Sequence, residues 1–132
     1  CAFDGHGEKG IGALLDLWRE ARVQPTDVDL ASIYDDYPTM VLAQANDLGL
    51  IPDGDLARFC RVTIGERRFP VNTWGGMLSA GQPGGFAGGL NGITEAVRQI
   101  RGTSCNQVGG VEHVLVTAGT GVPTSGLILA RP

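Results

Sequence analysis

The sequence has little of several features that define common protein classes. Its 10 Lys and Arg are outnumbered by 14 Asp and Glu, so it lacks the basic surface that nucleic-acid binding requires. No apolar run approaches the roughly 20 residues of a membrane span. Its first residues, CAFDGHGEKG, have none of the features of a signal peptide. We therefore expect a cytoplasmic protein that neither binds nucleic acid nor spans a membrane.

Cysteine and histidine are also scarce. The three cysteines, Cys1, Cys60 and Cys105, are an odd number and have neither the spacing of a zinc site nor that of a disulfide framework. Only two histidines, His6 and His113, accompany them. We expect reduced thiols and no bound metal.

Glycine, in contrast, is abundant, with 21 among 132 residues, and it is concentrated in residues 70–92. A flexible linker would be diluted with serine and other polar residues, whereas here apolar and amide side chains separate the glycines. A helical pattern of apolar residues follows, which predicts a helix over 86–101. Glycines before a helix let the backbone approach a ligand closely. This segment is therefore the first candidate for a functional loop.

The rest of the chain predicts alternating helices and short buried strands. Apolar periodicity and turn residues predict helices over 9–22, 39–48 and 56–61, and strands over 30–34, 111–117 and 124–131. The last two strands are close enough to pair antiparallel, and 62–71 could hold a short strand or hairpin. This pattern predicts one α/β domain over 1–132, with a mixed sheet and helices on both of its faces.

Two glycine-rich strings carry a resemblance to a known family. Residues 72–76 (NTWGG) and 79–85 (SAGQPGG) resemble the N-x-x-G-G and G-H-P-x-G motifs of thiolases. Residues 112–131 are similar to the closing hairpin of that superfamily, and 88–104 to its lipid-transfer and steroid side-chain aldolase branch. The resemblance implies the C-terminal half of a thiolase-like fold. Since the chain also begins at a cysteine, we expect a fragment of a longer protein.

The resemblance implies a role for Asn72 and the glycines after it. In thiolases the asparagine of this motif helps to form an oxyanion hole, and an amide is a fixed dipole suited to that task. Gly75 and Gly76 would then let the backbone lie against the substrate. The plainer interpretation is that Asn72 bonds the backbone of a tight turn.

Two departures from the thiolase pattern bear on the chemistry. Gln82 stands where thiolases have a histidine, and glutamine cannot act as a base near neutral pH. Ala118 stands where many thiolases have a second cysteine, in a stretch whose Gly119 and Gly121 we expect beside the substrate. Both losses argue against Claisen chemistry and leave retro-aldol cleavage, or no chemistry. Gln82 is then either a hydrogen-bonding site residue or a polar loop residue.

Tyr34 is the candidate proton-transfer residue. It ends a predicted buried strand, where α/β folds place ligands. The string Tyr34–Tyr37 (YDDY) resembles the Tyr-Asp-x-Phe context of a tyrosine implicated in proton transfer in steroid aldolases. A second tyrosine of those enzymes is absent from 81–83, and a phenol with an ordinary pKa near 10 needs help to act as a base. The alternative is a half-buried strand residue with a satisfied hydroxyl.

These residues lead to one function hypothesis and two alternatives. The first is the C-terminal domain of an acyl-CoA enzyme that cleaves a carbon–carbon bond in a lipid or steroid CoA thioester, with no cofactor beyond the coenzyme A of the substrate. The alternatives are a non-catalytic module that binds acyl-CoA or lipid, and an ordinary acetyl-CoA acyltransferase. The resemblance implies three partners: the missing N-terminal half, a second subunit in a homodimer, and a small OB-fold companion. The fragment alone should be inactive.

Overall fold

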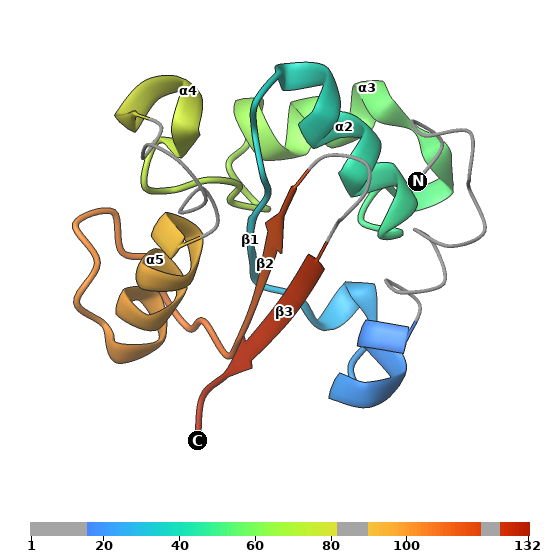
Figure 1. Ribbon diagram of the computed structural model, residues 1–132. Helices are drawn as coiled ribbons and strands as arrows, with labels where there is room; N and C mark the ends of the chain where they lie inside the picture. Colours follow the sequence, from blue (N-terminus) through green and yellow to red (C-terminus); the bar gives the residue numbers. More distant parts are fainter. Residues whose placement is uncertain (1–15, 82–89, 120–124) are drawn as a thin grey trace.

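The centre of the molecule is a mixed three-stranded sheet (Figure 1). The computed structural model describes residues 16–81, 90–119 and 125–132. The strands are β1 (Leu30–Ser32), β2 (His113–Ala118) and β3 (Ser125–Ala130), in that spatial order. β1 runs parallel to β2, and β2 runs antiparallel to β3. The predicted mixed sheet and its closing antiparallel pair are confirmed.

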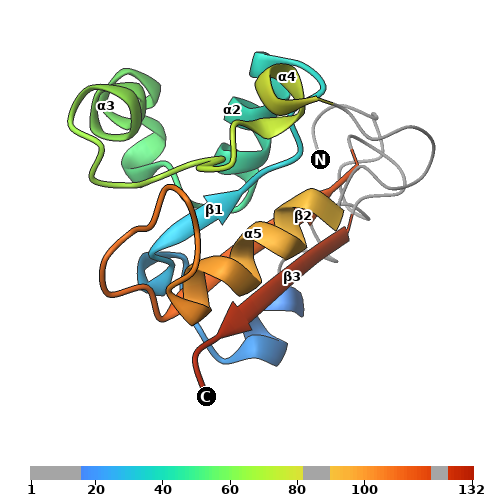
Figure 2. The same cartoon turned by 90° about the vertical axis from the view of Figure 1, so that its left-hand side faces the viewer.

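Helices lie on both faces of this sheet, as the sequence predicts. Figures 1 and 2 show α5 on one face, with α2 and the helical residues 16–21 on the other. No helix in the three described ranges is long and apolar enough to cross a membrane. The bounds of the helical elements are η1 Pro25–Asp27, α2 Pro38–Asp47, η2 Pro52–Gly54, α3 Leu56–Cys60, η3 Arg61–Gly65, α4 Gly76–Ala80 and α5 Leu90–Arg101.

The alternation of side chains along the strands explains why the sheet has an apolar core on each of its faces. Leu30 and Val114 are fully buried in a cluster with Ala96 of α5. Their neighbours Ala31 and Leu115 belong to a second, larger cluster, which includes residues of the 16–21 segment, α2 and α3. Successive strand residues point to opposite faces, so each apolar strand supplies both cores.

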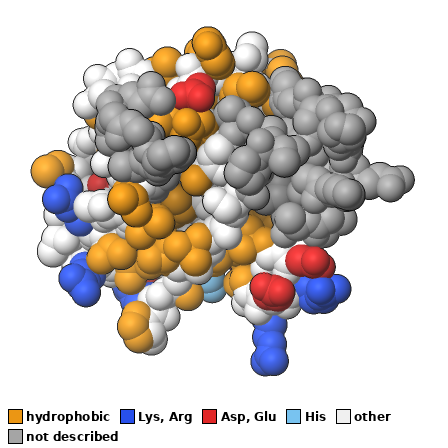
Figure 3. All heavy atoms as spheres, viewed as in Figure 1, with side chains coloured by type: hydrophobic (Ala, Val, Ile, Leu, Met, Phe, Trp, Pro, Cys, Tyr) orange, Lys and Arg blue, Asp and Glu red, His pale blue; other side chains and the backbone are white. Residues whose placement is uncertain are grey.

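Part of the apolar surface remains exposed. Leu90 in α5 and Leu127 in β3 are 59% and 43% exposed. Figure 3 shows hydrophobic side chains gathered over these two elements. An uncovered apolar face of this kind is typical of a surface that another protein segment covers.

The strand or hairpin predicted over 62–71 is wrong. Residues Arg61–Gly65 extend α3 as a π-helical stretch, in which the N–H of Glu66 donates to the carbonyl of Arg61 at 2.8 Å. The β-branched residues of this stretch suggested a strand, but the hydroxyl of Thr63 donates to the carbonyl of Phe59 at 2.8 Å and so supports the helical path. Of the predicted strand, only Val71 forms a bridge, parallel to Ala31.

The other sequence predictions can be compared element by element. The helix predicted over 39–48 and the short helix over 56–61 correspond to α2 and α3. The predicted helices over 9–22 and 86–101 are present where the chain is described, from residues 16 and 90 onward, while 9–15 and 86–89 lie outside the described residues. Helix α4, inside the glycine-rich segment, was not predicted.

Candidate active site

Tyr34 leaves the sheet at the carboxyl end of β1, and its backbone is held on both sides. Its N–H donates to Thr117 Oγ1 at 2.9 Å, and its carbonyl accepts from Gln44 Nε2 at 2.9 Å. The Thr117 hydroxyl donates to Gln44 Oε1 at 2.7 Å, which closes a ring of hydrogen bonds among β1, α2 and β2. Gln44 and Thr117 are 4% and 3% exposed, so water competes little for these bonds. The ring fixes where the Tyr34 side chain leaves the backbone.

Asp35, the next residue, anchors the glycine-rich segment. Its buried carboxylate accepts from the N–H of Met77 at 2.8 Å and of Leu78 at 3.4 Å, which are orphan donors at the start of α4. A Cβ on Gly76 would overlap this carboxylate, and Gly76 has a φ of +67°. Position 76 therefore requires glycine because a side chain there would overlap Asp35. The predicted contact of Gly76 with substrate stays a prediction.

Asn72 lies beside the same strand end and uses its amide on the backbone. Its Oδ1 accepts from the N–H of Ile33 at 2.8 Å, and its Nδ2 donates to the carbonyl of Ile33 at 2.9 Å. These bonds fit the plainer interpretation, a side chain that stabilises a turn with φ of +51°. An amide nitrogen has two N–H groups, and among the described residues only one of those of Asn72 has a hydrogen-bond partner. The oxyanion role of Asn72 stays a prediction.

Helix α5 starts close to the ends of β1 and β2. A Cβ on Gly92 would lie 2.6 Å from Ser32 Oγ and 3.0 Å from Val116 Cγ1, so only glycine permits this approach. Ser32 Oγ also accepts from the indole N–H of Trp74 at 3.0 Å. Three segments distant in the sequence thus meet directly before Tyr34.

A buried polar network that the sequence analysis missed supports the same loop from α5. Glu95 Oε1 accepts from the hydroxyl of Thr73 at 2.7 Å, the hydroxyl of Ser104 at 2.8 Å and Nε2 of Gln99 at 2.8 Å. Glu95 is 5% exposed and Gln99 is fully buried. The signal in the sequence was a polar residue four positions from another on a helix face. The network fixes Thr73, the neighbour of Asn72.

Two hollows adjoin Asp35, the residue after Tyr34. A small one, of about 10 Å³, is lined by Tyr34 and Thr117 together with Asp35, Trp74, Met77 and Gly92. A larger one, of about 340 Å³, lies between α2, the α3–η3 segment and α4, and includes Asp35 and Asn72 in its lining. The two hollows share Asp35, so the larger one lies next to the residues around Tyr34.

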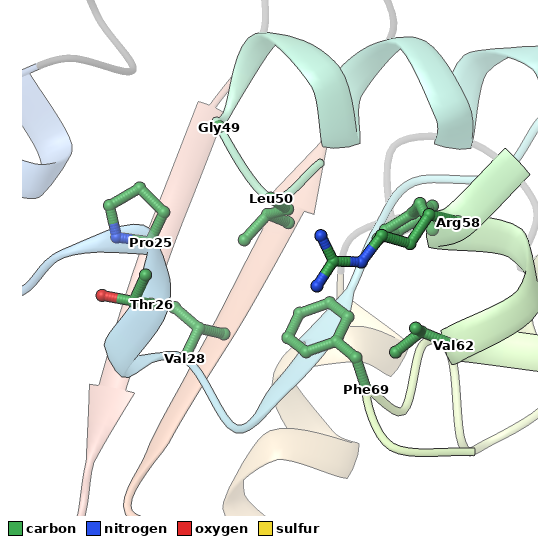
Figure 4. Close-up of a pocket in the computed structure, with 9 residues that line it drawn as sticks. Pro25, Thr26, Val28, Gly49, Leu50, Arg58, Val62 and Phe69 are labelled. Atoms are coloured by element: carbon green, nitrogen blue, oxygen red, sulfur yellow. The ribbon is translucent and has the colours of Figure 1, made fainter. Parts of the chain in front are cut away.

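A separate hollow of about 220 Å³ is shown in Figure 4. Arg58 of α3 reaches over the ring of Phe69, and Leu50 and Val28 line the space beside it (Figure 4). Among the described residues the Arg58 guanidinium has no ion pair. The lining of this hollow includes none of the residues that line the small hollow at Tyr34, and it shares only Phe59 with the larger one. We therefore assign the candidate site to the hollows near Tyr34.

The remaining predicted site residues divide into two groups. Gly75, with φ of +105°, precedes α4, and Gly119, with φ of +85°, directly follows β2 at the same edge of the sheet as Tyr34. Gln82 and Gly121 lie outside the described residues. The described residues include no group of three or more side chains suited to hold a metal ion.

The fold and the site identify the family. Residues 16–130 match the model of the thiolase C-terminal domain-like family, so the chain belongs to that family. The predicted resemblance is confirmed.

The relatives within the family include enzymes of steroid metabolism. The chain is 46% identical over 130 residues to the 17-hydroxy-3-oxo-4-pregnene-20-carboxyl-CoA lyase of Mycobacterium tuberculosis (strain ATCC 25618 / H37Rv), covering 96% of this chain and 32% of that protein. It is 47% identical over 116 residues to the steroid side-chain-cleaving aldolase of Thermomonospora curvata, covering 86% and 28%. The solved Ltp2-ChsH2(DUF35) aldolase has a TM-score of 0.80 and 43% identity, covering 92% of this chain and 31% of that one. The chain thus spans about a third of the length of these relatives.

Proposed function

We propose that this domain is the C-terminal part of an aldolase that cleaves a carbon–carbon bond in the CoA thioester of a steroid or related lipid. Its relatives include a steroid side-chain-cleaving aldolase and a carboxyl-CoA lyase at 47% and 46% identity. The observation that carries the proposal in this chain is the buried ring of hydrogen bonds that holds Tyr34 at the end of β1. A strand end whose backbone is fixed in this way suits a residue with a reacting side chain.

The reaction is a retro-aldol cleavage of a β-hydroxyacyl thioester. A base takes the proton of the β-hydroxyl, whose electron pair forms the carbonyl of the released ketone as the Cα–Cβ bond breaks. The electrons of that bond pass to the thioester as an enolate, and a proton then returns to the α-carbon. The protons balance, so the step requires no redox or metal cofactor, only the coenzyme A that the substrate carries. We assign the proton transfer at the β-oxygen to Tyr34.

Ala118 supports this reaction over thiolysis, and Asn72 is suited to stabilise an enolate in either. Asn72 lines the larger hollow, and its second N–H can donate to the oxygen of the enolate. Ala118, the last residue of β2, has no proton to give at the place where many thiolases have a cysteine. Gln82 stands where thiolases have a histidine. It is not a base near neutral pH and would act as a hydrogen-bonding group.

The catalytic unit extends beyond this chain. Because the chain spans about a third of its relatives, we propose that the rest of the parent protein supplies the coenzyme A contacts. The exposed apolar surface over α5 and β3 fits cover by that part or by a second subunit (Figure 3). The name of the solved relative joins Ltp2 with ChsH2(DUF35), which supports a companion protein.

The products of the full-length protein test the proposed function. Incubated with a β-hydroxyacyl-CoA of a steroid side chain, and with its companion if one co-purifies, the protein should release one ketone and one shortened acyl-CoA, without free coenzyme A as a co-substrate. Mass spectrometry of both products checks this. Cleavage that depends on added coenzyme A and yields acetyl-CoA would instead support an acyltransferase. Tight binding without cleavage would support the non-catalytic module.

A further inference from the structure

We propose that the hollow between α2, the α3–η3 segment and α4 binds the fused-ring body of the steroid thioester. This inference rests on the proposed function, since it assigns the apolar part of the same substrate to a place beside Tyr34. The hollow has a volume of about 340 Å³, within the roughly 300–1,000 Å³ range of small-molecule sites. Figures 1 and 2 both show α2, α3 and α4 gathered at the end of the sheet where β1 ends.

The lining of the hollow is apolar. Its apolar side chains come from three separate parts of the fold, and they include Val41, Leu42, Phe59, Ile64, Val71 and Leu78. Ile64 and Leu78 are 77% and 57% exposed, an uncommon exposure for aliphatic side chains that line one hollow. A rigid apolar ligand would cover these two side chains and gain the hydrophobic contribution of their burial.

The polar groups in the lining are mostly bonded to the protein already. The Asp35 carboxylate accepts from the backbone of α4, and the Thr63 hydroxyl donates to the carbonyl of Phe59. In the part of the chain that the structure describes, the second N–H of Asn72 has no partner and can contact a ligand. Such a site fits an apolar body that carries a polar group at one end, where it approaches Asn72 and Tyr34.

The backbone conformation of one wall of the hollow also indicates a binding function. The wall formed by Arg61–Gly65 is π-helical, a conformation that is rare and frequent at functional sites. It places Thr63 and Ile64 in the lining next to Cys60. Helix α4 lies between the two hollows, because Met77 lines the small hollow and Leu78 the large one. The larger hollow therefore lies next to the small one at Tyr34, which at about 10 Å³ has room for no more than a water-sized group.

Cys60 provides a direct readout of occupancy. It is a half-buried free thiol in the lining, whereas Cys105 is an exposed free thiol outside it. The full-length protein is treated with iodoacetamide, and peptides containing each cysteine are quantified by mass spectrometry. Progesterone serves as an uncharged four-ring probe. At about ten times its Kd it should slow Cys60 alkylation about tenfold and leave Cys105 unchanged, because only the unoccupied protein reacts.

Matched variants and a second probe make the test specific. Ile64→Asp places a charge in the apolar wall and should raise the progesterone concentration needed for protection about tenfold or more. Leu56→Asp, at an exposed site of the same helical segment outside the lining, should leave protection unchanged. Dodecanol, a linear apolar probe, should protect only at higher concentration.

Four results would overturn the assignment. Cys60 that does not react without a probe would show that protein covers the hollow in the full-length molecule. Reaction unaffected by progesterone, or equal effects of Ile64→Asp and Leu56→Asp, would place the ring body elsewhere. Protection by dodecanol alone would assign the hollow to a linear acyl chain. Since this measurement needs no turnover, its failure is distinguishable from failure of the cleavage assay.

Discussion

Replacing Tyr34 with phenylalanine in the full-length protein is expected to lower kcat for carbon–carbon cleavage by about 10²–10⁴-fold, the range for loss of a positioned acid or base. The substitution removes only the hydroxyl. The hydrogen bonds from the Tyr34 backbone to Thr117 and Gln44 are retained, so the strand end should keep its position. KM should stay near its unmodified value, because the lost interaction acts in the transition state. Initial rates of ketone release over a range of substrate concentrations measure both constants.

Tyr37→Phe is the matched control for this variant. Tyr37 is 65% exposed and lies three residues further along, directly before α2. The Tyr37→Phe variant loses the same hydroxyl oxygen at a site outside the two hollows near Tyr34. The turnover of this variant should therefore match that of the unmodified protein. Equal turnover of Tyr34→Phe and the unmodified protein would reject the assigned role, and equal losses in both variants would indicate a general effect on folding.

Gly76→Ala is expected to lower the free energy of unfolding by roughly 3–5 kcal/mol. Two causes add. Residue 76 has a φ of +67°, which L-residues with a side chain rarely adopt, and its new Cβ would overlap the Asp35 carboxylate. Either α4 or Asp35 must move, and the bonds from Asp35 to the N–H groups of Met77 and Leu78 are then lost. Urea denaturation of the variant and the unmodified chain, followed by tryptophan fluorescence, measures the difference.

Gly102→Ala separates these two causes. Gly102 has a similar φ of +71°, but nothing lies within 4 Å of its added Cβ. It should lower the free energy of unfolding by only about 1–2 kcal/mol, the contribution of the left-handed conformation. If both variants lose the same amount, the contact between Gly76 and Asp35 contributes nothing and the anchoring of α4 by Asp35 is wrong.

The architecture could be predicted because it depends on local patterns. The continuous apolar run of β2, the apolar residues of β3 and the turn between them predict a hairpin from neighbouring residues alone. Pro38 and the apolar periodicity after it predict α2 in the same way. The π-helical stretch could not be predicted, because β-branched Val62, Thr63 and Ile64 favour a strand by propensity and the packing of the segment decides otherwise.

The site could be predicted only in part, because its geometry depends on contacts between distant segments. Tyr34 and Asn72 were singled out from the motifs around them, and they do lie at one strand end, joined through Ile33. Nothing near Gln44 or Thr117 in the sequence indicates that they hold Tyr34, since they come from α2 and β2. Helix α4 was missed for the same reason: the Asp35 carboxylate that accepts its first N–H groups is far away in the sequence.

A crystal structure of the full-length protein with a non-cleavable β-hydroxyacyl-CoA analogue would show which side chain meets the β-oxygen. We expect the β-oxygen of the analogue about 2.6–3.2 Å from the Tyr34 hydroxyl, the reach of a hydrogen-bonded acid or base. We also expect an apolar body that extends toward Leu78 and Ile64. An analogue whose β-oxygen lies beside another residue, with Tyr34 in contact with protein alone, would contradict the proposed role of Tyr34.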